Sequence, residues 1–289
     1  MLAEPTPGWG SWGAHPLTIG WLVLVTVVYI RCYRRAGRYS SRSLTPHLVA
    51  FFLGLIAVAV ALLSPLDPVG DRWLLSAHVL QHVLLADIAP ALIVLGWRAP
   101  VLPLGLSPRI LRVVAPGGQL GRRLAWLRNG WLAATIWAAV QLAWGVPVLF
   151  DAAAASAPLH VFEHLTLLGS GLLLWWAVID PLPGERRRPA WSRLGYLGLS
   201  RAAAAAICLP LTWLGSALYP RYAEAPRAYG ISALRDQQIA GASMCLIELL
   251  VFGVAFMVVF LDLLSREERA TAVAERAASA PLRKVASSD

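Results

Sequence analysis

The segment AHVLQHVLLADIAPALIVLG, residues 77–96, decides the fold. A transmembrane helix needs about 20 mostly apolar residues, and this segment supplies them. It also contains His78, Gln81, His82 and Asp87, although polar and ionisable groups inside a bilayer are costly and mark functional positions by default. The segment therefore predicts a membrane protein that has a functional site within the membrane.

The composition of the whole chain supports a membrane location. Of the 289 residues, 58% are hydrophobic and 14% are charged, and the mean hydropathy is +0.62. Soluble domains average about 25% charged residues, so this composition excludes an ordinary soluble domain. The 13 tryptophans fit the same interpretation, because indole rings favour the membrane–water interface.

Seven segments are long and apolar enough to span a bilayer, and Pro, Gly and Asp in the short connections separate them. The sequence thus predicts an all-α polytopic membrane protein, a bundle of seven transmembrane helices. The expected spans are roughly 17–33, 46–65, 74–96, 131–150, 159–180, 197–219 and 236–264. Because the N-terminus has no basic region before its first apolar run, we expect a retained helix there and no cleavable signal peptide.

The arginines predict the orientation of the bundle. Of the 25 basic residues, 21 fall in alternate loops and the C-terminal tail, which places them on one side of the membrane. By the positive-inside rule that side is cytoplasmic, so the N-terminus lies outside and the C-terminus lies in the cytoplasm. The expected organisation is an extracytoplasmic tail (1–16), a transmembrane domain (17–264) and a cytoplasmic tail (265–289). The net charge of +9 then suits anionic lipid headgroups, and nucleic acid is not expected as a partner.

A second histidine motif repeats the pattern of the first. LHVFEHLTLL, residues 159–168, carries His160, Glu163 and His164 at the spacing of His78, Gln81 and His82. Residues i, i+3 and i+4 share one face of a helix, and both motifs fall early in spans that run in the same direction. We therefore predict that the four histidines form one metal site in the outer part of the bundle, with Gln81 and Glu163 orienting the rings. Asp236 and Gln237 open the seventh span at the same level and are expected to support the site.

Three other residues within the predicted spans are Asp87, Glu248 and Met244. Asp87 is half a helical turn out of phase with His78, so we expect it to face away from the histidines and to pair with another helix. Glu248 lies deep in the seventh span, where either a proton-carrying or a structural role is open. Met244 could line the floor of the metal site, although core packing is the favoured role.

The cysteines indicate which ligands a metal could have. Cys32, Cys208 and Cys245 are far apart in the sequence and form no CxxC motif. This spacing predicts neither a disulfide framework nor a thiolate zinc site. Any metal would accordingly be held mainly by imidazole and oxygen.

Several chemistries remain open for such a site. His-x-x-Glu-His at residues 160–164 is also an inverted-zincin pattern, but the first motif has Gln81 in place of the glutamate, and Gln cannot act as a general base. A b-type haem needs one axial histidine on each of its faces, so it would use one ring from each helix and leave two unexplained. Copper or a similar ion would use all four imidazoles.

The motifs also carry a family resemblance. HVLQHVLLADIAPALIVLG, PLHVFEHLTLLGSGLLLWWAVID and LYPRYAEAPRAYGISALRDQQIAGASM, taken in order, resemble the CtaG-type cytochrome c oxidase assembly factors of bacteria. The resemblance covers the third to seventh predicted spans, about two thirds of the chain. The chain departs from the family pattern at Pro90, where two prolines are expected, and at Cys245, where an aromatic residue is expected.

This resemblance implies a seven-span inner-membrane protein of a bacterial cell that handles copper for the oxidase. By matching position, it implies that the following residues form or support the outward histidine cluster that handles copper: His78, Gln81, His82, His160, His164, Asp236, Gln237 and Met244. The expected cofactor is copper, and the expected partners are cytochrome c oxidase subunits or a copper donor protein, together with membrane lipids. We expect binding and transfer without enzymatic turnover; the alternative is a bis-histidine b-type haem protein that transfers electrons.

Overall fold

The computed structural model describes residues 11–114, 118, 119, 123, 126, 129–181, 189–227 and 229–286, with side chains described up to Val273 and at Glu275. Every regular element in these ranges is helical. The helices are α1 (Pro16–Gly37), α2 (Thr45–Leu63), α3 (Leu66–Arg72), α4 (Leu75–Val83), the π-helical turn η1 (Leu84–Ile88), α5 (Ala89–Trp97), α6 (Val101–Gly105), α7 (Pro108–Val114), α9 (Gly130–Gly145), α10 (Pro147–Ala155), α11 (Ala157–Ile179), α12 (Ala190–Trp213), α13 (Pro220–Glu224) and α14 (Ala233–Ala286).

The predicted all-α membrane fold is confirmed. Six helical stretches are long and apolar enough to cross a membrane, and α9 with α10 makes a seventh if that bent pair counts as one span. The predicted span 131–150 is bent by 76° between these two helices. Pro147 causes the break, because proline has no N–H to donate and disfavours a helical residue before it.

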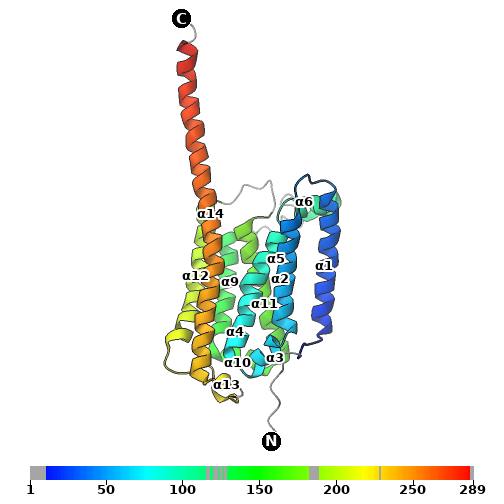
Figure 1. Ribbon diagram of the computed structural model, residues 1–289, viewed down its shortest axis with the longest axis vertical. Helices are drawn as coiled ribbons and strands as arrows, with labels where there is room; N and C mark the ends of the chain where they lie inside the picture. The colour runs from blue at the N-terminus through cyan, green and yellow to red at the C-terminus, as the bar shows by residue number, and fades with distance from the viewer. Residues whose placement is uncertain are drawn as a thin grey trace.

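The long helices form a bundle whose two ends differ (Figure 1). The short helices α3, α10 and α13 gather at one end, which we call the short-helix end, and α6 lies at the other, the α6 end. Within the bundle α4 packs against α14, α11 packs against α9 and α5, and α12 packs against α14 and α9. The long helix α14 continues well beyond the bundle at the α6 end (Figure 1). Which end faces the cytoplasm stays a prediction.

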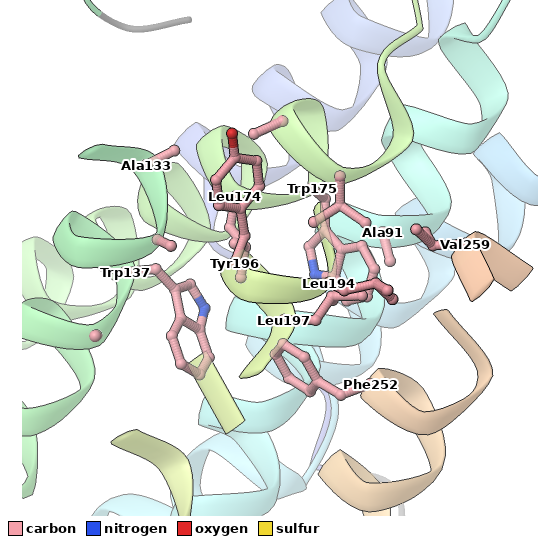
Figure 2. Close-up of a cluster of buried hydrophobic side chains, with 14 of the residues drawn as sticks. Ala91, Ala133, Trp137, Leu174, Trp175, Leu194, Tyr196, Leu197, Phe252 and Val259 are labelled. Atoms are coloured by element: carbon pink, nitrogen blue, oxygen red, sulfur yellow. The ribbon is translucent and has the colours of Figure 1, made fainter. Parts of the chain in front are cut away.

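A cluster of aromatic and aliphatic side chains fills the bundle between α5, α9, α11, α12 and α14. Figure 2 shows Trp137, Trp175 and Phe252 meeting there, and the ring centroids of the two tryptophans lie 5.5 and 5.6 Å from that of Phe252. Burying such rings is the main favourable contribution to packing in this cluster. Leu250 and Val254, on the outer face of α14, are more than half exposed, as expected for side chains that face lipid.

The third span contains a π-helical turn with an identifiable cause. Pro90 has no N–H, so the Ala86 carbonyl cannot receive the usual helical hydrogen bond. Instead the indole N–H of Trp137 donates to this carbonyl across 3.4 Å, and the Ala89 N–H donates to Leu84. The widened turn carries Asp87 and leaves the two histidines on the α-helical turns before it.

Two cysteines contradict the prediction from their spacing. Cys208 on α12 and Cys245 on α14 form a disulfide, with their Cα atoms 5.5 Å apart. The prediction was wrong because a separation of 37 residues says little about distance once α12 and α14 turn back on one another. The third cysteine, Cys32, is free and buried.

Candidate metal site

Helix α4 places its two histidines on one face, as the i, i+4 spacing predicts. The Nε2 atoms of His78 and His82 lie 2.8 Å apart. His78 is fully enclosed at 1% exposure, and the side chain of His82 is 13% exposed. The pair therefore forms one wall of a site that is almost closed to solvent.

Helix α11 supplies the opposite wall. The ring centroids of His160 and His164 are 4.2 Å apart, and those of His78 and His160 are 5.3 Å apart. Glu163, with no exposed surface, lies between the walls: its Oε1 is 3.5 Å from His82 Nε2 and its Oε2 is 4.0 Å from His78 Nε2. The structure thus brings the four predicted histidines together and adds a carboxylate at their centre.

Four of these five residues, all but His82, offer ligand atoms close enough to share one ion. One atom from each of His78, His160, Glu163 and His164 lies within 4.8 Å of the others. Nε2 of His160, Nε2 of His164 and both carboxylate oxygens of Glu163 are buried and have no hydrogen-bond partner. Buried polar atoms are normally satisfied, so this group of unpaired acceptors fits a cation better than it fits a packed core.

Tyr222 on α13 is a part of the site that the sequence did not reveal. Its hydroxyl donates to the Gly70 carbonyl at 2.5 Å and lies 3.0 Å from His78 Nδ1. Burial raises the pKa of this hydroxyl well above its usual range, so Tyr222 stays neutral with one proton to donate. Since that proton goes to Gly70, His78 must donate its Nδ1–H to Tyr222, which leaves the Nε2 lone pair aimed into the cluster.

Gln81 stands behind the histidine wall and binds neighbouring helices. Its amide donates to the Ala61 carbonyl at 2.9 Å and to Asp67 Oδ1 at 2.7 Å. Burial raises the pKa of the Asp67 carboxyl, and the hydrogen bond from Gln81 opposes that shift. Gln81 accordingly anchors α4 to α2 and α3, with no imidazole among its hydrogen-bond partners.

Asp236 and Gln237 support the site from a distance. The backbone N–H groups of Leu75 and Ser76 donate to the Asp236 carboxylate at 2.6 and 3.2 Å, so Asp236 caps α4 from the first turn of α14. Gln237 accepts from the Leu218 N–H at 2.6 Å and donates to the Ser216 carbonyl at 3.1 Å. Both hold the elements that carry or cover the cluster, because a capped α4 fixes the direction of its histidines.

Met244 lies below the cluster beside His82. The two residues line a small space of about 30 Å³ together with Gln141, Phe150 and Tyr219. This space has room for about one water molecule. The structure thus places Met244 on the inner side of the site, within the packed apolar core between α12 and α14.

A cavity at the short-helix end gives access to the cluster. It has a volume of about 480 Å³ and is lined by His160, Asp67, Asp71 and His15, among others. His15 Nε2 is 3.8 Å from Asp67 Oδ2, so a histidine outside the two motifs stands at the mouth of the cavity. The acidic lining would attract a cation before it reaches His160.

These observations define a class: a multi-span helical membrane protein with a buried cluster of histidines around a glutamate near one end of the bundle. Residues 27–266 match the family described as cytochrome c oxidase caa3 assembly factor (Caa3_CtaG). This match covers well over half of the chain. The chain belongs to this family, and the resemblance drawn from the histidine motifs is confirmed.

Relatives occur in mycobacteria. An uncharacterized protein of Mycobacterium leprae is 28% identical over 234 residues, which cover 76% of this chain and 34% of the relative. An uncharacterized protein of Mycobacterium bovis is 28% identical over 187 residues, covering 61% of this chain and 27% of the relative. The chain thus spans about a third or less of the length of these relatives. No solved structure gives a significant match.

Proposed function

We propose that this chain binds copper in the cluster of His78, His82, His160, Glu163 and His164 and transfers it during assembly of cytochrome c oxidase. One observation carries the proposal: imidazole and carboxylate atoms from two helices converge within 4.8 Å, and several of them are buried without a hydrogen-bond partner. Imidazole binds copper well, and first-row divalent ions follow an order in which copper is bound most tightly.

Charge balance supports monovalent copper as the cargo. In the metal-bound form, neutral imidazoles and one ionised Glu163 would give the donor set a charge of about −1, which a single positive ion would cancel. A net charge in an apolar interior is costly, so a neutral complex is favoured. A divalent ion would leave a positive charge that the donors at the centre of the site do not offset.

The packing of the rings argues against the haem alternative. In five of the six histidine pairs the ring centroids lie 4.2 to 6.3 Å apart. A bis-histidine haem must fit its whole macrocycle between two axial rings. Rings this close together leave no room for a macrocycle between them.

A binding and transfer role without turnover also fits the surroundings of the site. The cavity at the short-helix end leads to His160, so both a copper donor protein and a receiving oxidase subunit would approach there. If that end is extracytoplasmic, as the arginines predict, the site faces the compartment from which oxidase subunits are metallated. Membrane lipids would surround the rest of the bundle.

The test is metal binding by the purified full-length chain in detergent. Copper content and the visible spectrum are measured after addition of Cu(I), for the wild type and for the variant His82→Ala/His164→Ala. We expect about one copper per wild-type chain, loss of copper in the variant and no Soret band. His47→Ala, which removes an imidazole from α2 away from the cluster, is the matched control and should bind as the wild type does.

Two outcomes would overturn the proposal. A Soret band at haem stoichiometry would favour the electron-transfer alternative. Copper that survives in the double variant, or is lost equally in His47→Ala, would mean that the bound metal lies outside the cluster.

A further inference from the structure

A second group of buried ionisable residues lies deeper in the bundle, outside the metal site. Asp87, on the π-helical turn, has no exposed surface, and neither of its carboxylate oxygens has a hydrogen-bond partner. The sequence predicted that it pairs with another helix. It faces one, but the group whose charge acts on it is a second acid, Glu248 on α14.

Glu248 is equally enclosed. It has no exposed surface, and its oxygens also lack a hydrogen-bond partner. Its nearest positive group is the guanidinium of Arg201 on α12, with Nη1 3.8 Å from Glu248 Oε2. Among the described residues, Asp87, Glu248 and Arg201 are therefore the charged groups that face one another from the turn η1 and the helices α14 and α12.

The charge of this trio depends on one proton. With both acids ionised and Arg201 positive, the group carries a charge of about −1; with one acid protonated, it is neutral. Burying an uncompensated charge is expensive in an apolar core. The neutral form, with Glu248 ionised beside Arg201 and Asp87 protonated, is therefore favoured.

An open groove runs along α14 from near this depth toward the α6 end. It has a volume of about 600 Å³ and is lined by Ile88, next to Asp87, and by Leu250 and Val251, within one turn of Glu248. At the α6 end it is lined by Arg98, Asp180, Arg193 and Asp262. Ala91, Trp175 and Val259, labelled in Figure 2, also line it.

The lining of this groove does not include Asp87, Glu248 or Arg201. Its side chains are mainly apolar, and Leu250 and Val254 on its rim are exposed and face lipid. The two acids of the trio are therefore enclosed in the apolar core, and the members of the trio must balance one another's charge.

We propose that Asp87, Glu248 and Arg201 form a proton-binding site in which the two acids share one proton. On release, the O–H bond of the Asp87 carboxylic acid breaks, the proton passes to water, and a carboxylate remains. Uptake reverses the step.

Infrared spectroscopy of the metal-free, full-length chain tests the site. Because Glu163 is another buried acid whose oxygens have no hydrogen-bond partner, all samples carry Glu163→Gln. We expect a C=O stretching band of a protonated carboxylic acid at neutral pH, which shifts in D2O. Either Asp87→Asn or Glu248→Gln should remove the band, because the acid that remains then pairs with Arg201 in ionised form. Glu224→Gln, which alters an exposed acid on α13, is the control and should leave the band unchanged.

The spectra decide between the proposal and its rivals without any metal. Absence of the band before Asp87 or Glu248 is changed would mean that both acids are ionised and serve as fixed charges. A band that is only halved by each substitution would mean that the two acids hold separate protons. Either result overturns the shared proton, and the first needs no substitution at Asp87 or Glu248 that could disturb folding.

Discussion

Tyr222 shows how one side chain outside the histidine motifs can set the chemistry of the candidate metal site. Its hydroxyl proton is committed to the Gly70 carbonyl, so its oxygen is free to accept from His78 Nδ1. This arrangement selects the tautomer in which the Nε2 lone pair of His78 is available to bind a metal. Partners of this kind, which touch the ligand and not the metal, commonly change metal affinity by about 10- to 100-fold when they are removed.

Tyr222→Phe should therefore weaken Cu(I) binding by about tenfold or more, with the copper stoichiometry kept. Competition against a Cu(I) chelator measures the change in affinity. The matched control is Tyr219→Phe, because the Tyr219 hydroxyl donates to the Gly145 carbonyl at 2.9 Å and not to an imidazole. If the two variants lose affinity equally, the effect comes from loosening of the segment around α13 and not from the orientation of His78.

At this scale the sequence predicted what is local and missed what is distant. The two histidine pairs follow from i, i+4 spacing, and Glu163 follows from its position within the motif. Tyr222 lies 144 residues from His78 on a five-residue helix, so no periodicity could connect them. The Asp67–Gln81 hydrogen bond was not predicted for the same reason, because it depends on how α3 folds back between two spans.

Among the elements, the crossing of α11 and the third span depends on a glycine. A Cβ atom at Gly171 would collide with the Ala86 carbonyl and lie 2.7 Å from Pro90 Cγ. The missing side chain lets α11 approach the π-helical turn closely, and the same approach holds the two histidine walls at their spacing. Small residues at such crossings are typical of helix packing in membranes.

Gly171→Ala should consequently destabilise the bundle, by about 1–3 kcal/mol on the scale of overpacked cores, and should weaken copper binding as α11 moves away. Gly169→Ala is the control on the same helix, since a Cβ there meets nothing within 4 Å and alanine favours a helix. Thermal unfolding in detergent and Cu(I) affinity are measured for both. A Gly171→Ala variant as stable as Gly169→Ala would show that the close approach is not needed.

The membrane spans could be predicted because lipid requires long apolar helices. The bend and the π-helical turn that interrupt these spans were not predicted. The bend between α9 and α10 occurs at a proline that a continuous apolar run had hidden. Predicting the π-helical turn would have required knowing that Trp137 lies beside it, because its indole N–H satisfies the carbonyl that Pro90 leaves free. Both irregularities are tertiary in origin, since neighbouring helices determine whether a strained turn is supported.

For the molecule as a whole, the disulfide between Cys208 and Cys245 covalently joins two of the spans. Such bonds form in oxidising compartments and are rare in the cytosol. Cys208 lies five residues before the end of α12 at Trp213, towards α13 and the short-helix end. The bond therefore agrees with the predicted extracytoplasmic position of that end, while the orientation stays a prediction.

Removing this bond with Cys208→Ala/Cys245→Ala should lower the unfolding temperature, because a native disulfide typically contributes about 2–4 kcal/mol. A reductant should lower the unfolding temperature of the wild type to the same value and leave that of the double variant unchanged. Cys32→Ala, which removes the free cysteine, controls for loss of a buried thiol. A wild-type protein unaffected by reductant would show that the two thiols are not joined.

The small space beneath His82 bears on the route by which an ion could reach the cluster. On that side Met244, Phe150 and Tyr219 leave about 30 Å³, and the disulfide joins the two helices behind them, whereas the cavity at His160 measures about 480 Å³. Under the proposed function, a bound ion would use the cavity at His160 both to enter and to leave the cluster. A donor protein and an acceptor protein would then dock there one after the other, and the residence time of the ion in the cluster would limit the rate of transfer.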